Sequence, residues 1–274
     1  MAEPRNNFIE SDNAAYVRAV HDKGLAFDLS TMSRRKMLAA VGSVGALALF
    51  GRQALAGDQA SAAACVAEIE SETAGPYPAD GSNGIEVRTL AGIVRSDIRS
   101  SFGTSTTVAP GIPLTISLKI QNLACVALPG AAVYVWHCDR AGRYSLYSAG
   151  ATNENYLRGI GVTDSTGTVR FTSIFPACYT GRWPHIHFEV YSSLAEATSG
   201  SGPIRKTSQI ALPKDVSDVV YATSGYSQSV ANLSRLTLAS DMVFGDDNAA
   251  REMATMTGSV SSGYTATLAA TVRA

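Results

Sequence analysis

Hydrophobic and polar residues alternate along several short segments of the chain. Between Leu114 and Ile120, aliphatic residues occupy every second position and Thr, Ser and Lys occupy the others. This period of two predicts a β-strand with one buried face. We expect further strands over residues 87–94, 133–138, 168–175, 185–191 and 264–272, and short helices over 215–222 and 248–254. Short strands separated by turn residues predict an all-β fold, a single sandwich of mostly antiparallel strands with few short helices.

Composition and charge agree with a β-rich chain. Of its 274 residues, 46% are hydrophobic and only 16% are charged, and 24 are glycine. A helical bundle would contain more Glu, Lys and Leu. The formal net charge is −1. Nucleic acids and anionic membrane surfaces need a concentrated basic surface, so neither is an expected partner.

The first 56 residues have the pattern of an export signal. The basic sequence Ser33-Arg34-Arg35-Lys36 precedes an apolar run that ends at Phe50, and Ala54-Leu55-Ala56 follows. Such a run is short for a membrane span, which needs about 20 residues. The paired arginines resemble a twin-arginine signal. We therefore expect residues 1–56 to be removed, leaving residues 57–274 as one periplasmic or secreted domain without stable membrane association. A cytosolic N-terminal helix and a retained anchor are the alternatives.

Four cysteines lie beyond this segment, at positions 65, 125, 138 and 178. An even number in an exported chain indicates two disulfide bonds, and four cysteines allow three pairings. We favour Cys125–Cys138 together with Cys65–Cys178. The sequence contains no Cys-x-x-Cys pair, so a zinc knuckle is not expected.

Two histidines stand two positions apart on the strand predicted over residues 185–191. Alternate residues of a strand point to the same side, so His185 and His187 share one face while Ile186 and Phe188 take the other. Two imidazoles arranged in this way can hold one metal ion. By itself the pattern is equally consistent with two ordinary sheet histidines.

The surroundings of these histidines resemble the intradiol ring-cleaving dioxygenases, the family of catechol and protocatechuate dioxygenases. Three segments carry the resemblance, in the family's order: Glu72-Thr73-Ala74-Gly75-Pro76-Tyr77, then Pro129 to Asp139 continuing to Gly142-Arg143-Tyr144, and last Tyr179 followed by Arg182-Trp183-Pro184-His185-Ile186-His187. Together they span over half of the chain that follows the export signal.

This resemblance implies one mononuclear non-haem Fe(III) ion per chain. Its protein ligands would be Tyr144, Tyr179, His185 and His187, with a solvent hydroxide completing the set. Phenolate is a hard, anionic donor that favours ferric over ferrous iron. A metal must drive the loss of the phenol proton, because the ordinary pKa of tyrosine is near 10. Tyr134 and Tyr147 are the neighbours that could be mistaken for the first tyrosine ligand. The ligand set implies a metal site between loops and one edge of the sandwich.

The resemblance also suggests roles around the metal. Arg182 would stabilise negative charge on the substrate ring, and Gln209 would contact that arginine. Tyr179 would leave the metal when substrate arrives and accept one of its protons. The mouth of the pocket would be lined by Thr73, Pro76 and Tyr77. We expect His137 and Trp136 to be packing residues.

The implied reaction is cleavage of a catechol-type ring with O₂ to a cis,cis-muconic acid, without an organic cofactor. One alternative is an exported β-sandwich binding module that keeps the fold but has no turnover. Another is a copper or zinc site that uses only the two histidines. A carboxylate on the substrate would need a cationic partner, and the sequence does not place Arg143, Arg158 or Arg205 there. The sequence leaves the substrate and the oligomeric state open, with a homo-oligomer as one option.

Overall fold

The structure is a computed structural model and describes residues 67–273. The predicted export signal over residues 1–56 and the predicted disulfide cysteine Cys65 lie outside the described residues. Within the described part of the chain, no helix is long and apolar enough to cross a membrane.

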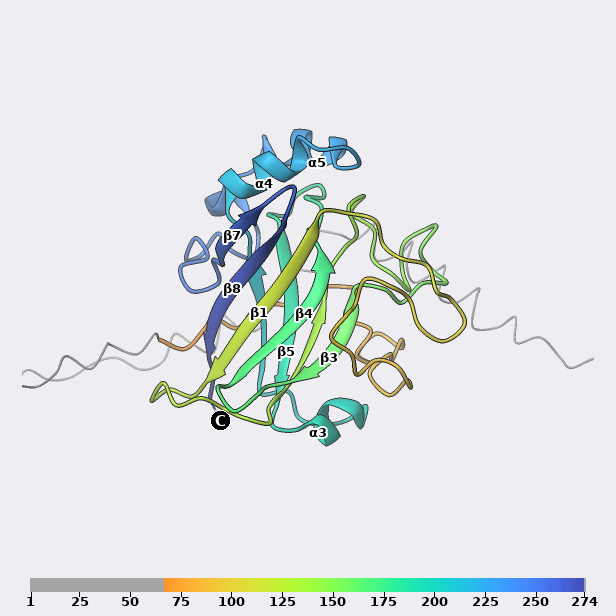
Figure 1. The fold of residues 1–274 in the computed structure, drawn as a ribbon. Helices are drawn as coiled ribbons and strands as arrows, with labels where there is room; N and C mark the ends of the chain where they lie inside the picture. Colours follow the sequence, from red (N-terminus) through yellow and green to blue (C-terminus); the bar gives the residue numbers. More distant parts are fainter. Residues whose placement is uncertain (1–66, 274) are drawn as a thin grey trace, which may run out of the picture.

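Within residues 67–273, eight strands form two four-stranded sheets (Figure 1). The strands are β1 (Pro113–Gln121), β2 (Ala132–Trp136), β3 (Arg158–Val162), β4 (Thr168–Ile174), β5 (His185–Tyr191), β6 (Lys206–Ala211), β7 (Thr255–Ser259) and β8 (Gly263–Thr271). One sheet has the order β4-β1-β8-β7 and the other β3-β2-β5-β6. The pairings between these strands are antiparallel except that of β1 with β8, which is parallel. The β-rich, mostly antiparallel architecture is therefore as predicted.

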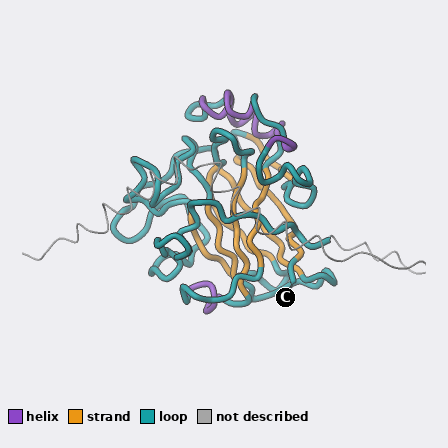
Figure 2. Tube along the Cα trace, turned by 180° about the vertical axis from the view of Figure 1, so that it is seen from behind, coloured by secondary structure: helices purple, strands orange, loops and turns teal. Residues whose placement is uncertain are grey.

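Short helices lie at the two ends of the sheets, and loops make up much of the rest (Figures 1 and 2). They are α3 (Leu194–Thr198), α4 (Lys214–Tyr221), α5 (Ser227–Leu233) and a 3₁₀ turn, η1 (Leu238–Ser240). Figure 1 shows α4 and α5 together at one end and α3 at the other. The helix predicted over residues 215–222 is confirmed as α4.

Two predicted elements are wrong. Residues 87–94 form turns, with a positive φ of 103° at Gly92 and one isolated bridge from Val94 to Ile160. Residues 248–254 also form turns, because Asn248 and Ala249 have positive φ angles of 60° and 54°. Left-handed residues cannot continue a right-handed helix. The prediction missed β3, β6, β7, α3 and α5, and β2 ends at Trp136, two residues earlier than expected.

The two faces of the second sheet are both covered. Ile186 and Phe188 of β5 belong to the core that also contains Ile116 and Phe171 of the other sheet. The opposite face carries a second cluster, which includes Trp136 and is covered by residues from the segments before β1 and after β2. This double coverage explains why all seven residues of β5 are buried. Polar side chains on its second face are therefore shielded from water.

The predicted disulfide pairing is wrong. Cys138 and Cys178 are both free thiols in buried positions, which excludes the pairs Cys125–Cys138 and Cys65–Cys178. Burial raises the pKa of both thiols, that of Cys178 to about 12. Cysteine count and compartment suggested bonds, but spacing along the chain contains no information on which sulfurs approach each other.

We expect the thiols of Cys138 and Cys178 in the purified, non-reduced protein to react with an alkylating reagent only when the protein is unfolded. Their burial and raised pKa values keep them protonated and shielded in the native state. Alkylation with and without denaturant, followed by peptide mass spectrometry, measures this. Complete absence of alkylated Cys138 and Cys178 after unfolding would contradict the structure.

Candidate metal centre

Strand β5 brings two imidazole nitrogens together near its N-terminal end. His185 and His187 lie on the same face of the strand, as predicted, and both are buried. Their Nε2 atoms are 3.1 Å apart. Because β5 lies between β2 and β6, the histidines are on an inner strand rather than on an edge strand.

Two tyrosine hydroxyls from separate loops reach the same point. Tyr144 lies in the loop after β2, and its Oη is 3.3 Å from Nε2 of His185. Tyr179 lies between β4 and β5, and its Oη is 3.2 Å from the same nitrogen. Tyr144 is buried, whereas Tyr179 is partly exposed. The fold thus gathers all four predicted donors from three segments of the chain.

The two histidines are oriented by different interactions. The Nδ1–H of His185 donates to the carbonyl of Trp183 at 2.6 Å, which leaves the Nε2 lone pair directed at the tyrosines. By contrast, Nδ1 of His187 is buried without a hydrogen-bond partner among the described residues. Its ring stacks on Trp136 instead, with centroids 4.9 Å apart and planes within 5°. Trp136 stacks in turn on Tyr134. Trp136 therefore packs, as expected, and also sets the plane of a candidate ligand.

Burial favours the uncharged forms of these donors when no cation is bound. It lowers the pKa of His185 and His187 well below the ordinary value, and the neighbouring Arg182 charge adds to the effect. It also raises the pKa of Tyr144 well above the ordinary value. Neutral imidazole is the metal-binding form of histidine. A phenol in this environment loses its proton only when a cation replaces it.

The two phenol oxygens and two imidazole nitrogens fit Fe(III) better than they fit a copper or zinc ion held by the histidines alone. Ligands about 2.1 Å from one metal and at right angles to each other lie about 3 Å apart, close to the separations observed here. Across residues 67–273, no group of three or more His, Cys, Asp and Glu side chains could hold a metal. A metal at this site would therefore need the phenol oxygens, which favour Fe(III). Two nitrogens alone would leave copper or zinc with too few protein ligands.

Arg182 lies beside this cluster, and hydrogen bonds hold its guanidinium in place. The residue is 5% exposed, and its Nη2 donates to Oε1 of Gln209 at 2.7 Å. Gln209 in turn donates from Nε2 to the carbonyl of Thr73 at 2.9 Å. The predicted contact between Arg182 and Gln209 is thus present in the structure. It also ties the arginine to residues 72–77, which we call the entry segment.

A buried carboxylate that the sequence did not reveal completes this arrangement. Oδ2 of Asp241 accepts from Nε of Arg182 at 3.1 Å and from the backbone N–H of Trp183 at 2.6 Å. Its Oδ1 accepts from the backbone N–H groups of Val243 and Phe244. Burial alone would lower the pKa of Arg182, but the nearby Tyr179 and Asp241 raise it overall. Asp241 follows η1, far along the chain from Arg182, and no local motif marks it.

The entry segment lies against the candidate donors. Gly75 has a φ of +68°, and a Cβ added there would sit 3.4 Å from Cε1 of His187. The ring of Tyr77 lies 4.9 Å from that of Tyr144. Thr73 accepts from the backbone N–H of Gly75 through Oγ1, and Pro76 accepts from Asn83 through its carbonyl. The segment therefore covers the metal centre on one side.

The alternative donors have other partners. The hydroxyl of Tyr134 donates to the carbonyl of Pro78, and that of Tyr147 donates to Asn83. His137 is hydrogen-bonded at both nitrogens, to the carbonyl of Cys138 and to Ser173. Burial lowers the pKa of His137 to about 4. These contacts agree with the packing role predicted for His137.

The three arginines that the sequence could not place also have partners. Arg143 forms an ion pair with Asp139, with 2.7 Å between Nη2 and Oδ2. Arg205 donates to Ser192 at 2.6 Å, on the surface. Arg158 is 1% exposed, and its guanidinium donates to the carbonyls of three residues and to two hydroxyls, on Tyr77, Pro78, Ser145 and Tyr134. Arg158 thus ties the entry segment to the loop of Tyr144.

Comparison with known proteins points to one group. Residues 99–198, less than half of the chain, match the sequence profile of a family described as dioxygenase. A catechol 1,2-dioxygenase from Pseudomonas sp. (strain EST1001) is 34% identical over 61 residues, which are 22% of this chain. The alignment covers only 20% of the length of that curated relative.

Solved structures extend the similarity to most of the chain. An intradiol ring-cleavage dioxygenase from Tetranychus urticae matches 76% of this chain and 95% of its own, with 25% identity and a TM-score of 0.59. Catechol 1,2-dioxygenase from Pseudomonas arvilla C-1 shares the fold, with 14% identity, a TM-score of 0.50 and coverage of 98% and 78% of the two chains. The chain is therefore similar to dioxygenases in sequence over part of its length, and similar in fold to the intradiol ring-cleavage dioxygenase from Tetranychus urticae over most of it.

Proposed function

We propose that this protein is a ferric intradiol dioxygenase that cleaves a catechol with O₂ to a cis,cis-muconic acid. One observation carries the proposal: Nε2 of His185 lies 3.1 to 3.3 Å from each of three other donor atoms, which are the phenol oxygens of Tyr144 and Tyr179 and Nε2 of His187. The solved relative from Tetranychus urticae, named as an intradiol ring-cleavage dioxygenase, supports the same reaction.

Bound Fe(III) would act as a Lewis acid and hold the catechol ring in register for oxygen attack. His185 and His187 supply neutral nitrogen donors on a rigid strand. Tyr144 supplies an oxygen from a buried position under Tyr77. Tyr179 is partly exposed, so its Oη is the donor that can turn away and accept a substrate hydroxyl proton.

Arg182 supplies the positive charge of the site. Its guanidinium is held from two sides by Asp241 and Gln209, so it need not reorient when negative charge develops on the substrate ring. Such fixed charge is more effective than a mobile one, because little reorganisation occurs during the reaction. Asp241 in this view is a positioning residue.

The first test compares Tyr144→Phe with Tyr147→Phe. Phenolate bound to Fe(III) absorbs visible light, so loss of the Tyr144 oxygen should bleach or shift the band and reduce kcat by about 1,000-fold or more. Tyr147 is a matched control, since it is equally buried but its hydroxyl bonds to Asn83 and Ala79. A visible spectrum, iron content per chain and oxygen uptake on catechol measure this.

A colourless protein that cannot be loaded with iron would refute the proposal. An iron-loaded wild type that releases no muconate from a panel of catechols would instead favour the binding module, which keeps the fold without turnover.

The second test addresses Asp241. Asp241→Asn removes the charge partner of Arg182 and should lower kcat per bound iron by about tenfold or more, because a positioned ion pair is lost. Iron content should stay near that of the wild type. Asp97→Asn is the control: Asp97 also pairs with an arginine, Arg99, at 2.7 Å, but on the exposed surface. Combining Asp241→Asn with Arg182→Gln should add little further loss, whereas multiplied losses would contradict a role through Arg182.

The third test addresses the stacked pair. Trp136→Leu removes the ring that orients His187 and should weaken iron binding about tenfold or more, as loss of outer ligand support commonly does. Trp136→Phe keeps an aromatic face and should retain most of the affinity. Competition for iron with a chelator measures both variants. If Trp136→Leu binds iron as tightly as the wild type, the stacked ring does not support His187 as a ligand.

A further inference from the structure

The segment that follows β4, residues 175–178, is held along its length by the helix pair α4 and α5. At its start, the hydroxyl of Tyr226 donates to the carbonyl of Phe175 at 2.8 Å, and that of Tyr221 donates to the carbonyl of Pro176 at 3.0 Å. Tyr221 is the last residue of α4, and Tyr226 directly precedes α5. Both tyrosines are buried in the larger hydrophobic core, so this part of the segment is fixed to the interior of the protein.

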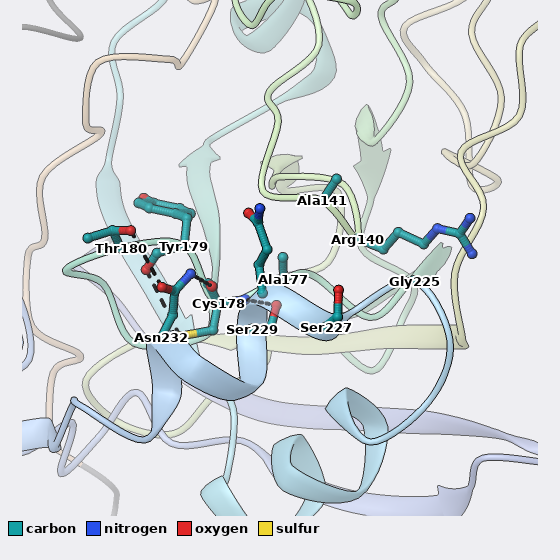
Figure 3. A pocket seen from close by; sticks show the side chains of 11 residues that line it. Arg140, Ala141, Ala177, Cys178, Tyr179, Thr180, Gly225, Ser227, Ser229 and Asn232 are labelled. Carbon is teal, nitrogen blue, oxygen red and sulfur yellow. Dashed lines mark hydrogen bonds between the residues drawn. The ribbon is translucent and has the colours of Figure 1, made fainter.

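At the end of the segment, α5 holds Cys178, the residue before the candidate ligand Tyr179. Oγ of Ser229 accepts from the N–H of Cys178 at 3.0 Å, and Nδ2 of Asn232 donates to its carbonyl at 2.8 Å. Figure 3 shows both bonds close to Tyr179. Because the N–H and the carbonyl of Cys178 are both bound by α5, the helix fixes the backbone that leads into the candidate ligand.

Tyr179 and Arg182 stand at the two ends of one turn. The N–H of Arg182 donates to the carbonyl of Tyr179 at 3.3 Å, and Gly181 has a positive φ of 84°, which glycine adopts at no steric cost. The thiol of Cys178 donates to the carbonyl of Arg182 at 3.4 Å. A displacement of Cys178 would therefore disturb both the candidate ligand and the backbone of the arginine.

The surroundings of Tyr179 away from α5 include one close contact and one open space. A Cβ added at Gly142 would lie 3.2 Å from the Cβ of Tyr179, so the turn after β2 approaches the ligand closely there. A cavity of about 460 Å³, partly open to solvent, borders residues 177–180, and its lining also includes Arg140 and Asn232 (Figure 3). Packing is incomplete along this cavity. The hydrogen bonds from α5 are therefore the interactions that fix the backbone on this side.

We propose that Ser229 and Asn232 of α5 are positioning residues for Tyr179. They fix the backbone at Cys178, so that Tyr179 leaves the metal by rotation of its side chain while the turn and Arg182 stay in place. This role rests on the proposed function, because it requires iron at the four candidate donors. It assigns to α5 a part in the reaction that acts only through the leaving ligand.

The test is Asn232→Ala in the iron-loaded protein, read by visible spectroscopy before and after catechol is added without O₂. Loss of the bond to the Cys178 carbonyl should let the Tyr179 oxygen move from its place, so the absorption band of the protein without catechol should shift or weaken. Once catechol is bound and Tyr179 has left the metal, the spectra of the variant and the wild type should coincide. A general loss of structure would change both spectra.

Ser229→Ala is the second variant, and it is read in the protein without added iron. It removes the acceptor for the N–H of Cys178, so hydrogen exchange at this amide, followed by NMR, should be about fivefold faster or more. Asn122→Ala is the matched control. Asn122 is half-buried like Asn232 and also binds backbone groups, the N–H groups of two residues, but it lies in the turn after β1. This variant should keep the wild-type spectra and exchange rate.

Tyr179→Phe separates this role of α5 from the proposed function. If loss of the Tyr179 hydroxyl leaves the band of the protein without catechol unchanged, Tyr179 is not a ligand, and the proposed metal centre and the role of α5 are both refuted. If Tyr179→Phe changes the band but Asn232→Ala does not, α5 does not position the ligand and the proposed function stands. Equal changes in the two spectra of Asn232→Ala, or an unchanged exchange rate in Ser229→Ala, would also overturn the positioning role.

Discussion

Strand β5 has to serve two different environments at once. Its Ile186 and Phe188 fill the core between the sheets, and its His185 and His187 face the second cluster, around Trp136, on the other side. A shift of one residue in its pairing with β2 or β6 would put imidazoles into the apolar core and aliphatic side chains into the metal centre. Correct pairing of this strand is therefore required both for stability and for the proposed chemistry. The tyrosines and Arg182 are placed by loops that anchor on this strand and its neighbours.

Two arginines buried around the strand are each matched by specific partners. Arg182 faces Asp241 and Gln209, while Arg158 is surrounded by carbonyl and hydroxyl oxygens. Removing one partner of a buried ion pair costs about 3–5 kcal/mol, because the other charge stays buried without compensation. Arg158 has a different task from Arg182: its five donors are used in joining two backbone segments, so it has none left for a substrate. Burial alone thus does not identify a reactive arginine.

Local pattern was enough to predict strand β5, which carries the two histidines of the candidate site. The alternation around β1 and β5 gave the correct strands and the correct faces, because a period of two is written directly in the sequence. The contact between Gln209 and Arg182 was predicted from a family resemblance, because the local pattern of hydrophobic and polar residues does not show which distant residues meet in the fold. Asp241 and the cavity around Arg140 depend on segments that approach only in the folded chain. The turn at Asn248 was missed because left-handed backbone at a non-glycine residue has no strong sequence signal.

The four candidate ligands differ in how firmly the protein holds them, and this order bears on the reaction. His185 is fixed by a backbone carbonyl and His187 by a stacked ring, both on a strand. Tyr144 lies buried under Tyr77 in a loop that Arg158 braces. Tyr179 is the partly exposed donor, and it borders an open cavity. A ligand that must leave when substrate binds should be the one with the least packing to lose and a space beside it. By this criterion the proposed exchange of protein oxygen for substrate oxygen would be confined to Tyr179, and the other three donors would keep the geometry of the site.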